Sequence, residues 1–425
     1  MAPRRSRGRI VSTFGDFTRL QETLGWVREH SPFYRERLSA AARIDEYEAF
    51  RAEVPRTTKT EVASEQRSAP PYGRLLAVPR SQVSLVHTSP GPIYMPRTAE
   101  EHGGTPVLGH ALETIGVRRG DVAHVTLSYH VMPGGLRLHR AFEEHGCIVI
   151  NGGTGSSELQ VQLAKELGAT VYAGTPSFFA NLLDSARTLG LDPRRDLRYR
   201  IGFSTAQALT PALRSELEAG FGVELFDHCG EALIGPLAGE CRAHRGMHLH
   251  RGELFLEFLD PESGQPVAQG EIGEVVATHL GRRAMPLVRY APGDAYRLLA
   301  GDCPCGDPSP RVEFVGQVGV VRKVKGVLVH PAQVARLLAE FPEAGRFQIV
   351  VDRPQGQRYE RATLRIALRD RLAREDDAEW RRRVAERVKQ QILLQMDIEC
   401  CEEAAIPETA AAPAFKDAIV DRTHS

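Results

Sequence analysis

Cysteine and histidine side chains that could bind a soft metal ion occur in the second half of the sequence. Cys303 and Cys305 are separated by one residue, so one tight turn can bring both thiolates together. Cys241 and His248 flank a short loop, and His250 lies two residues further along the same face of an expected strand. These residues are candidates for a metal site, and a set of thiols without metal is the alternative.

The seven cysteines in the chain are an odd number, and the sequence shows no secretion signal. Both observations argue against a disulfide framework and favour a cytoplasmic protein. Lys plus Arg and Asp plus Glu number 54 each, which gives no reason to expect a nucleic-acid or membrane-surface partner. A chain of 425 residues is too long for one ordinary core, so we expect two or three domains.

Between about residues 106 and 240, short β-branched runs alternate with amphipathic helical segments. The expected strands are Val122–Thr126, Cys147–Asn151, Thr170–Ala173 and Tyr199–Ser204. The expected helices are Leu136–Glu144, Ser157–Leu167, Phe178–Leu189 and Pro211–Phe221. This alternation predicts an α/β fold with a parallel sheet and a ligand at the carboxyl ends of its strands.

The pattern on either side of this region is different. Residues 14–51 have helical spacing, and residues 248–300 are rich in strands and turns typical of an antiparallel sheet or barrel. After Gly316 the sequence predicts a compact α+β unit. Its expected elements are a helix from Pro331 to Glu340, strands at Phe347–Val351 and Thr363–Leu368, and a long charged helix over about 378–394. The stretch Glu403–Pro413, rich in Ala and Pro, is expected to be a loop or linker.

An ordered set of segments resembles the phenylacetate–CoA ligase family of adenylate-forming enzymes, from about Leu20 to Arg422. The segments are Ser31-Pro32-Phe33-Tyr34, Pro55-Arg56-Thr57-Thr58-Lys59, Pro133-Gly134-Gly135-Leu136, Gly152-Gly153-Thr154-Gly155, Gly174-Thr175-Pro176-Ser177, Glu231 with Gly235-Pro236, Gly239-Glu240-Cys241, Met285-Pro286-Leu287-Val288-Arg289-Tyr290, Gly293-Asp294, Cys303-Pro304-Cys305-Gly306 and Lys323-Val324-Lys325-Gly326. The resemblance implies a large N-terminal adenylate-forming domain, residues 1–317, which combines parallel sheets, helices and a β-rich subdomain. It also implies a small mobile α+β C-terminal domain, residues 318–425. In the family, an acid attacks ATP to give an acyl-adenylate, and a thiol, usually that of coenzyme A, then displaces AMP.

The resemblance also implies roles for single residues. Glu231 matches the family's magnesium-binding glutamate, and Asp294 matches its ribose-binding aspartate. The Tyr-Gly that usually precedes the glutamate is absent, so Asp227 and His228 would offer the polar contacts to the nucleotide. Lys416 stands where the family's catalytic lysine is expected, near the C-terminus.

Two segments depart from the family pattern. The phosphate loop is shortened, and two of its residues are Pro90 and Pro92, which have no N–H to donate. Thr88, Ser89 and Gly91 would form a reduced anion site, or the segment is now a structural turn between strands.

The second departure lies at the hinge. Gln317 replaces the arginine that usually approaches the ribose, and Gly319 replaces the hinge aspartate. Glycine preserves rotation at the hinge, but the charge-assisted contact of the arginine is lost.

The resemblance places the acid pocket at expected strand ends. Gly153, Phe203, Ser204 and Thr205 border it, and Tyr129 faces it. An apolar and aromatic lining suits an aromatic carboxylic acid, although aromatic residues at such spacing more often belong to a core. The family also holds a structural zinc through Cys241, His248, Cys303 and Cys305, with His250 as the alternative imidazole. Three thiolates and one imidazole complete a closed tetrahedral site.

The sequence therefore favours ATP- and magnesium-dependent activation of a small carboxylic acid, with coenzyme A as the expected acceptor. A homodimer or a carrier-protein partner is compatible with the sequence. The competing hypothesis is a degenerate homologue that has lost adenylation. Such a protein would bind an acyl or nucleotide ligand, transfer an acyl group without ATP, or support a partner protein.

Overall fold

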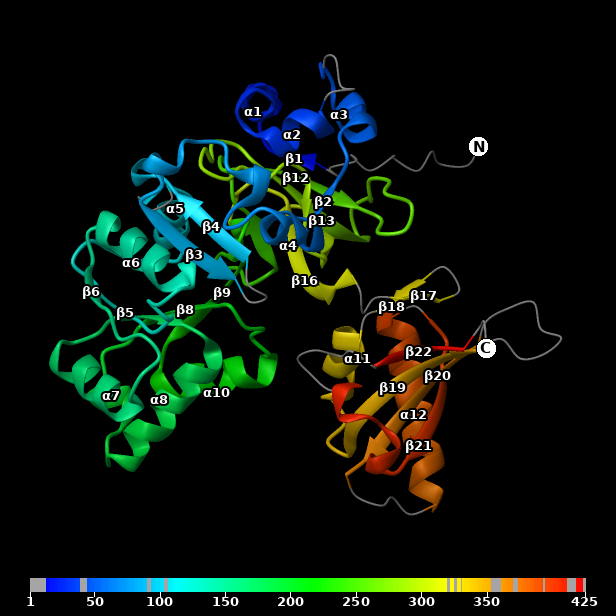
Figure 1. Cartoon of the computed structure of the whole chain (residues 1–425). Helices are drawn as coiled ribbons and strands as arrows, with labels where there is room; N and C mark the ends of the chain where they lie inside the picture. Colours follow the sequence, from blue (N-terminus) through cyan, green and yellow to red (C-terminus); the bar gives the residue numbers. More distant parts are fainter. Residues whose placement is uncertain are drawn as a thin grey trace, which may run out of the picture. The chain divides into compact units, whose positions relative to one another are not determined.

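The computed structural model describes residues 13–38, 44–89, 93–102, 106–318, 322–324, 327–329, 331–352, 361–369, 374–392, 394–410 and 418–422. The chain forms two compact units (Figure 1). The first contains residues 1–292 and 297–313, and the second contains residues 293–296 and 314–425.

The expected parallel strands form one half of the main sheet of the first unit. They are β5 (Val122–Val125), β6 (Ile148–Ile150), β7 (Val171–Gly174), β8 (Ile201–Thr205) and β9 (Glu224–Glu231). Their order in the sheet is β6-β5-β7-β8-β9, and neighbouring strands are parallel throughout. Parallel strands bring their carboxyl ends to one edge, so Thr205 at the end of β8 lies beside His228 near the end of β9.

Helices cover both faces of this parallel half. They are α5 (Pro106–Thr114), α6 (Pro133–His145), α7 (Ser157–Glu166), α8 (Pro176–Thr188), α9 (Pro193–Asp196) and α10 (Pro211–Phe221). Helices α5 and α6 pack on one face, in a core that contains Leu112 and Phe142. Helices α7, α8 and α10 pack on the other face around Phe179 and Phe221 (Figure 1). The alternating pattern in the sequence therefore predicted these elements to within a few residues.

The β-rich region continues the same sheet rather than forming a separate one. Its strands are β10 (Gly235–Glu240), β11 (Met247–Leu249), β12 (Leu254–Leu259), β13 (Ile272–His279), β14 (Tyr290–Ala291), β15 (Asp294–Leu299) and β16 (Arg311–Gln317). Together with β1 (Thr13–Phe14) and β2 (Thr57–Thr58) they complete a 14-stranded sheet. Strand β9 is the junction, because it pairs parallel with β8 and antiparallel with β10.

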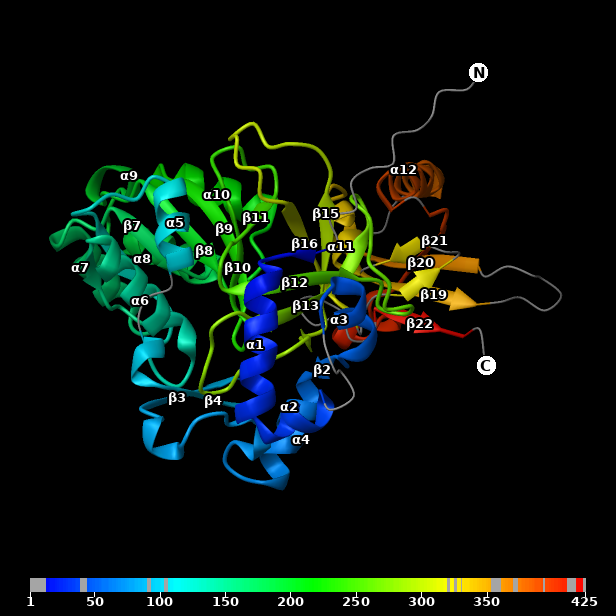
Figure 2. The ribbon, with the colours of Figure 1, turned by 90° about the horizontal axis from the view of Figure 1, so that it is seen from above.

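The N-terminal helices pack on the antiparallel half of the sheet. They are α1 (Phe17–His30), α2 (Pro32–Arg37), α3 (Tyr47–Glu53) and α4 (Lys59–Ser68). Helix α1 lies alongside β12 and β13 (Figure 2), and Arg19 donates to the carbonyls of Gly252 and Leu280 there. A separate hairpin, β3 (Leu85–Ser89) and β4 (Ile93–Arg97), ends at the expected phosphate loop.

The second unit has its own core. Its four-stranded sheet has the order β21-β20-β19-β22. Its elements are the hairpin β17 (Arg322–Val324) and β18 (Val327–Val329), α11 (Pro331–Leu338), β19 (Ala344–Asp352), β20 (Arg361–Leu368), α12 (Arg374–Ile392), β21 (Asp397–Cys401) and β22 (Ile419–Asp421). Trp380 and Val384 of α12 pack against Leu364 and Ile366 of the sheet.

One expectation for the second unit is wrong in part. The stretch Glu403–Pro413 was expected to be a loop or linker, but short 3₁₀ turns form at Glu403–Ala405 and Glu408–Ala410. Ile406 and Ala410 are each only 1% exposed and belong to the core of this unit. Across the part of the chain that the structure describes, each helix is too short or too polar to cross a lipid bilayer.

Candidate functional site

Glu231 ends strand β9 at the carboxyl edge of the parallel half of the sheet. One carboxylate oxygen, Oε2, accepts the backbone N–H groups of Leu233 at 2.7 Å and Ile234 at 3.0 Å. These bonds fix the side chain over the turn into β10. Its other oxygen, Oε1, accepts no hydrogen bond from the described residues. A carboxylate that is held by one oxygen and open at the other fits a magnesium ligand.

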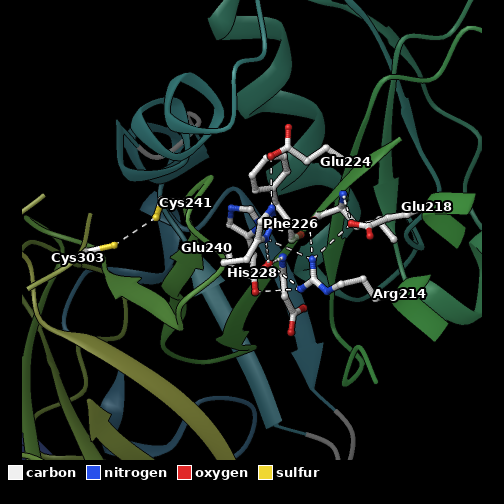
Figure 3. A network of polar contacts seen from close by, with 11 residues as sticks. Arg214, Glu218, Glu224, Phe226, His228, Glu240, Cys241 and Cys303 are labelled. Atoms are coloured by element: carbon white, nitrogen blue, oxygen red, sulfur yellow. Dashed lines mark hydrogen bonds and ion pairs between the residues drawn. The ribbon is translucent and has the colours of Figure 1, made fainter. Parts of the chain in front are cut away.

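Asp227 lies four residues before Glu231 and contacts Glu240, which belongs to a network of charged side chains with Arg214, Glu218 and Glu224 (Figure 3). Arg214 on α10 binds both carboxylate oxygens of Glu240, at 2.9 and 2.8 Å. The same carboxylate accepts the backbone N–H of Asp227 at 2.8 Å. Burial raises the pKa of Asp227 to about 7, and the charge of Glu240 adds to the increase, whereas Arg214 opposes it. The Asp227 carboxyl group therefore changes charge near neutral pH.

His228 is buried rather than open to solvent. Its ring stacks on that of Phe203 with the centroids 3.8 Å apart, and Nδ1 donates to the carbonyl of Phe226 at 3.3 Å. Burial lowers the pKa of His228 to about 3, so the imidazole is neutral at pH 7. A contact between His228 and a nucleotide stays a prediction.

The residues expected around the acid lie at the strand ends as anticipated, but differ in exposure. Phe203 and Ser204 are at most 2% exposed, and Phe203 belongs to the same core as Phe142. Thr205 and Tyr129 are partly exposed, and the hydroxyl of Tyr129 lies 3.3 Å from Nδ1 of His139. Gly153 has a φ of +67°, which favours glycine, in the turn after β6. The acid pocket stays a prediction, and Phe203 would contribute to it from within the core.

Strand β3 carries the described part of the expected phosphate loop. The backbone N–H of Thr88 donates to the carbonyl of Val131 at 2.8 Å, so it is not free for an anion. Ser89 is buried, with 3% exposure. Gly91, Pro90 and Pro92 lie outside the described residues. The reduced anion site therefore has one donor fewer than the sequence suggested.

Three further predicted residues belong to the second unit. Asp294 begins β15 directly after Gly293, whose φ is +88°, and it is partly buried. Gln317 ends β16 and is exposed. Lys416 lies outside the described residues. The roles of these residues toward ATP stay predictions.

The four predicted metal ligands come together in the first unit. The ligand atoms of Cys241, His248, Cys303 and Cys305 all lie within 4.8 Å of one another. The Sγ atoms of Cys241 and Cys303 are 3.7 Å apart, and Sγ of Cys305 is 3.3 Å from Nε2 of His248. A tetrahedral zinc with bonds of about 2.3 Å to sulfur requires a separation of about 3.8 Å between two sulfurs. The donor set and its spacing therefore fit zinc.

Of the two histidines that were considered as the fourth ligand, His248 is buried and His250 is partly buried, and only His248 reaches the thiols. Its Nδ1–H donates a hydrogen bond to the carbonyl of Ser309 at 3.1 Å, which leaves Nε2 unprotonated and facing the cysteines. Such a bond fixes the tautomer of a metal-binding imidazole. His250 stacks loosely on His228 instead, with the centroids 6.5 Å apart.

Sequence comparison relates the chain to known ligases. Residues 326–415 match the family model of the AMP-binding enzyme C-terminal domain. The phenylacetate-coenzyme A ligase of Thermus thermophilus is 33% identical over 350 residues, which cover 79% of this chain and 77% of that protein. The chain belongs to the phenylacetate–CoA ligase family. A second member, from Pseudomonas putida, is 32% identical over 74% of this chain and 73% of its own length.

The fold of this phenylacetate–CoA ligase family member is shared with a more distant solved structure. An open conformation of 2-hydroxyisobutyryl-CoA ligase, in complex with 2-HIB-AMP and CoA, has a TM-score of 0.83 and 22% identity. The match covers 95% of this chain and 90% of the other. The adenylate-forming fold that the sequence motifs predicted is therefore confirmed.

A group of charged residues in the first unit was not expected from the sequence. They line a cavity of about 520 Å³ between the β3–β4 hairpin, the start of α6 and the ends of β12 and β13. The charged residues are Arg19, Arg97, Glu100, Glu101, Arg137, Arg251, Glu253 and Arg282. These residues come from segments that lie far apart in the sequence, between positions 19 and 282, so no local motif indicated that they meet.

Proposed function

We propose that this protein activates a small aromatic carboxylic acid with ATP and magnesium and transfers the acyl group to coenzyme A. Family membership supports the type of reaction, because relatives that match 74–79% of the chain are phenylacetate-coenzyme A ligases. The preference for an aromatic acid rests on those relatives and on the partly exposed ring of Tyr129 beside the strand ends.

The observation that carries the proposal is the hydrogen bonding of the two carboxylate oxygens of Glu231. Its Oε2 atom is occupied by two backbone N–H groups, while Oε1 has no partner among the described residues. A magnesium ion bound by Oε1 would neutralise phosphate charge on ATP, and this is the chemistry that the metal supplies when bound. The Glu231 carboxylate itself would position the ion, because its orientation is already fixed by the turn.

The direct test is acid-dependent release of pyrophosphate, measured over a panel of aromatic and aliphatic acids with and without coenzyme A. We expect release with an aromatic acid, and formation of an acyl thioester when coenzyme A is present. Glu231→Gln should abolish magnesium-dependent release, and Glu216→Gln, at an exposed position on α10, should leave it unchanged. If a carrier protein replaces coenzyme A as the acceptor, the assay with coenzyme A should show adenylate formation without thioester formation.

A structural zinc is the second part of the proposal. Cys241, His248, Cys303 and Cys305 would hold the ion in a closed site without a position for water, so the metal would stabilise the fold rather than act on substrate. The site joins the loop after β10 and strand β11 to the loop before β16, segments that are distant in the sequence.

The competing candidate is a degenerate homologue that binds a ligand without adenylation. It is favoured by Pro90, Pro92, Gln317 and Gly319 in the sequence, and by the Thr88 N–H that is already bonded to Val131. Thermal stability with ATP and magnesium separates the two candidates, because a ligand at 100 times its dissociation constant stabilises by about 2.7 kcal/mol. No shift at millimolar ATP, together with no pyrophosphate release from any acid, would favour the degenerate homologue.

A further inference from the structure

The charged cavity of the first unit contains more positive than negative side chains. Five of the lining residues are arginines and three are glutamates. The arginines come from five places in the chain, namely α1, β4, α6, the loop before β12 and the loop after β13. All belong to the first unit, so the cavity is formed within one compact body.

Two of the five arginines have no hydrogen-bond acceptor among the described residues. Arg19 donates to the carbonyls of Gly252 and Leu280, and Arg282 donates to that of Leu233. Nε of Arg251 donates to Oγ of Ser309 at 2.9 Å. By contrast, the guanidinium groups of Arg97 and Arg137 form no hydrogen bond or ion pair with any described residue, although both side chains are partly buried.

The carboxylates of the cavity do not supply the missing acceptors. Oε1 of Glu101 accepts the backbone N–H of Arg283 at 2.7 Å, and Oε2 accepts that of Thr98 at 2.9 Å. Glu253 is near enough to influence the charges of Arg97 and Arg137 but makes no hydrogen bond or ion pair within the described part of the chain. The two guanidinium groups therefore have nearby negative charge from Glu253 but no hydrogen-bond acceptor among the described residues.

The positive charges of the arginines act on one another. Burial and, to a smaller extent, the charge of Arg97 lower the pKa of Arg137 to about 10, although Glu253 and Glu231 oppose the decrease. Burial also lowers the pKa of Arg282, with added repulsion from Arg97 and Arg137. An anion bound among these groups would relieve both effects, because it supplies the opposite charge and hydrogen-bond acceptors together.

The backbone adds to the positive potential. Pro133, Leu136 and Arg137 on the first turns of α6 line the cavity. Met132, the residue before the helix, makes no side-chain cap, so the first N–H groups of α6 have no side-chain acceptor there. A helix start of this kind favours negative charge.

We propose that this cavity is an anion-binding site, which takes the carboxylate or phosphate group of a small molecule on Arg97 and Arg137. The planar guanidinium group binds both anions through two parallel hydrogen bonds. A volume of about 520 Å³ is within the range of small-molecule sites.

The register of the β3–β4 hairpin places Arg97 at the end opposite the expected phosphate loop. Arg97 pairs with Leu85 at the open end of the β3–β4 hairpin, whereas Ser89 and Ile93 pair at the loop end. Four residues of strand span about 13 Å. On the opposite side, the cavity is lined by Gly235 and Pro236, which pair with Glu231 and Gly230. An anion on Arg97 and Arg137 would therefore lie beside the segment that positions Glu231, in a cavity that also reaches His87 next to the expected phosphate loop.

Two sources of the anion are distinguishable by experiment. Binding of inorganic phosphate, pyrophosphate, benzoate and phthalate to the intact chain is measured by calorimetry. Arg137-dependent binding of phosphate or pyrophosphate identifies a free anion as the ligand. Arg137-dependent binding of phthalate but not of benzoate or the inorganic anions identifies the second acidic group of an organic acid. Neither result depends on adenylation, so this experiment tests the anion site independently of the proposed activity.

The variants decide whether the arginines carry the binding. Arg137→Gln and Arg97→Gln should each lower the affinity for the anion by about 10- to 100-fold, the usual effect of losing a charged hydrogen-bond partner. Arg140→Gln, at an exposed position on the same helix, should change the affinity by less than about twofold. If Arg137→Gln does not fold, Arg137→Lys is the second variant. It keeps the positive charge but loses the two parallel N–H donors of the guanidinium group, so it should still weaken anion binding. Wild-type protein that binds none of the four probes below about 1 mM, or variants at Arg97 and Arg137 that bind like wild type, would overturn the proposal.

Discussion

The guanidinium of Arg289 forms a bidentate ion pair with the carboxylate of Glu257 inside the first unit. The two hydrogen bonds are 2.9 Å from Nε to Oε2 and 3.0 Å from Nη2 to Oε1. The side chains are only 5% and 1% exposed. The remaining nitrogen, Nη1, donates to the carbonyls of Arg51 and Val54. The pair therefore attaches the end of α3 to the antiparallel half of the main sheet.

Removal of Arg289 should be among the most destabilising single changes in this unit. Arg289→Met leaves the Glu257 charge buried without its partner, which costs about 3–5 kcal/mol. We expect this loss in the free energy of unfolding, measured by chemical denaturation. The control is Arg297→Met, because Arg297 pairs with the exposed Glu313 at 3.9 Å and such a pair contributes at most about 1 kcal/mol. Equal losses in both variants would contradict the stabilising role of the buried pair.

The Arg289–Glu257 ion pair is a contact that could not be predicted from the sequence. Arg289 was recognised as part of the segment from Met285 to Tyr290, but Glu257 lies 32 residues earlier in a strand without any motif. A contact between two charged residues that far apart depends on strand register, which local patterns do not encode. For the same reason the sequence did not predict that Arg97 and Arg137 line one cavity. Arg97 is on β4 and Arg137 is on α6, and the two come together only when the β3–β4 hairpin packs near α6.

The elements with strong periodicity were predictable for a physical reason. Strands β5, β7 and β8 are buried between two layers of helices, so their sequences are short apolar runs that contrast with the amphipathic helices. Two strands of the second unit, β21 at Asp397–Cys401 and β22 at Ile419–Asp421, were missed. Both lie at the edges of their sheet, and edge strands are short and bury little apolar surface.

The convergence of Cys241, His248, Cys303 and Cys305 was predictable because cysteine spacing is a strong local signal, and the zinc itself stays a prediction. We predict that purified protein, prepared without chelators, contains about one zinc per chain by elemental analysis. Cys303→Ser should lose the zinc and lower the melting temperature, since a structural metal contributes folding free energy. Cys147→Ser should keep it, because Cys147 lies outside the cluster. Zinc-free wild-type protein with normal stability would exclude a structural metal at this site.

Asp227 should make the stability of the protein depend on pH. Burial raises its pKa from 3.8 in the unfolded chain to about 7 in the folded protein. Between these values the folded protein binds the proton more strongly, so the free energy of unfolding falls as the pH rises from about 4 to 7. The shift corresponds to at most about 4 kcal/mol.

Asp227→Asn should remove this dependence. The variant should gain stability relative to wild type as the pH is raised from 5 to 8, by up to a few kcal/mol. Denaturation curves at several pH values measure the difference between the two proteins. The control is Asp184→Asn, because Asp184 is exposed on α8. A difference between Asp227→Asn and wild type that stays constant with pH would show that Asp227 keeps an ordinary pKa.

Lys416 provides the last prediction, because the family resemblance assigns it to one half of the reaction. In the family, the small domain presents its lysine to the acid and ATP during adenylation and then rotates before the thiol attacks. A cation near the reacting phosphate stabilises charge that develops only in the first step. We therefore expect Lys416→Ala to reduce acid-dependent pyrophosphate release by about 100-fold or more, with little effect on thioester formation from a supplied acyl-adenylate. The two half-reactions are measured separately, with pyrophosphate detection for the first and coenzyme A consumption for the second. Lys389→Ala, at an exposed lysine near the end of α12, is the matched control and should leave both rates unchanged. If Lys416→Ala slowed both half-reactions equally, the lysine would serve the fold or the general binding of substrates, and the assignment of a catalytic lysine to this position would be wrong.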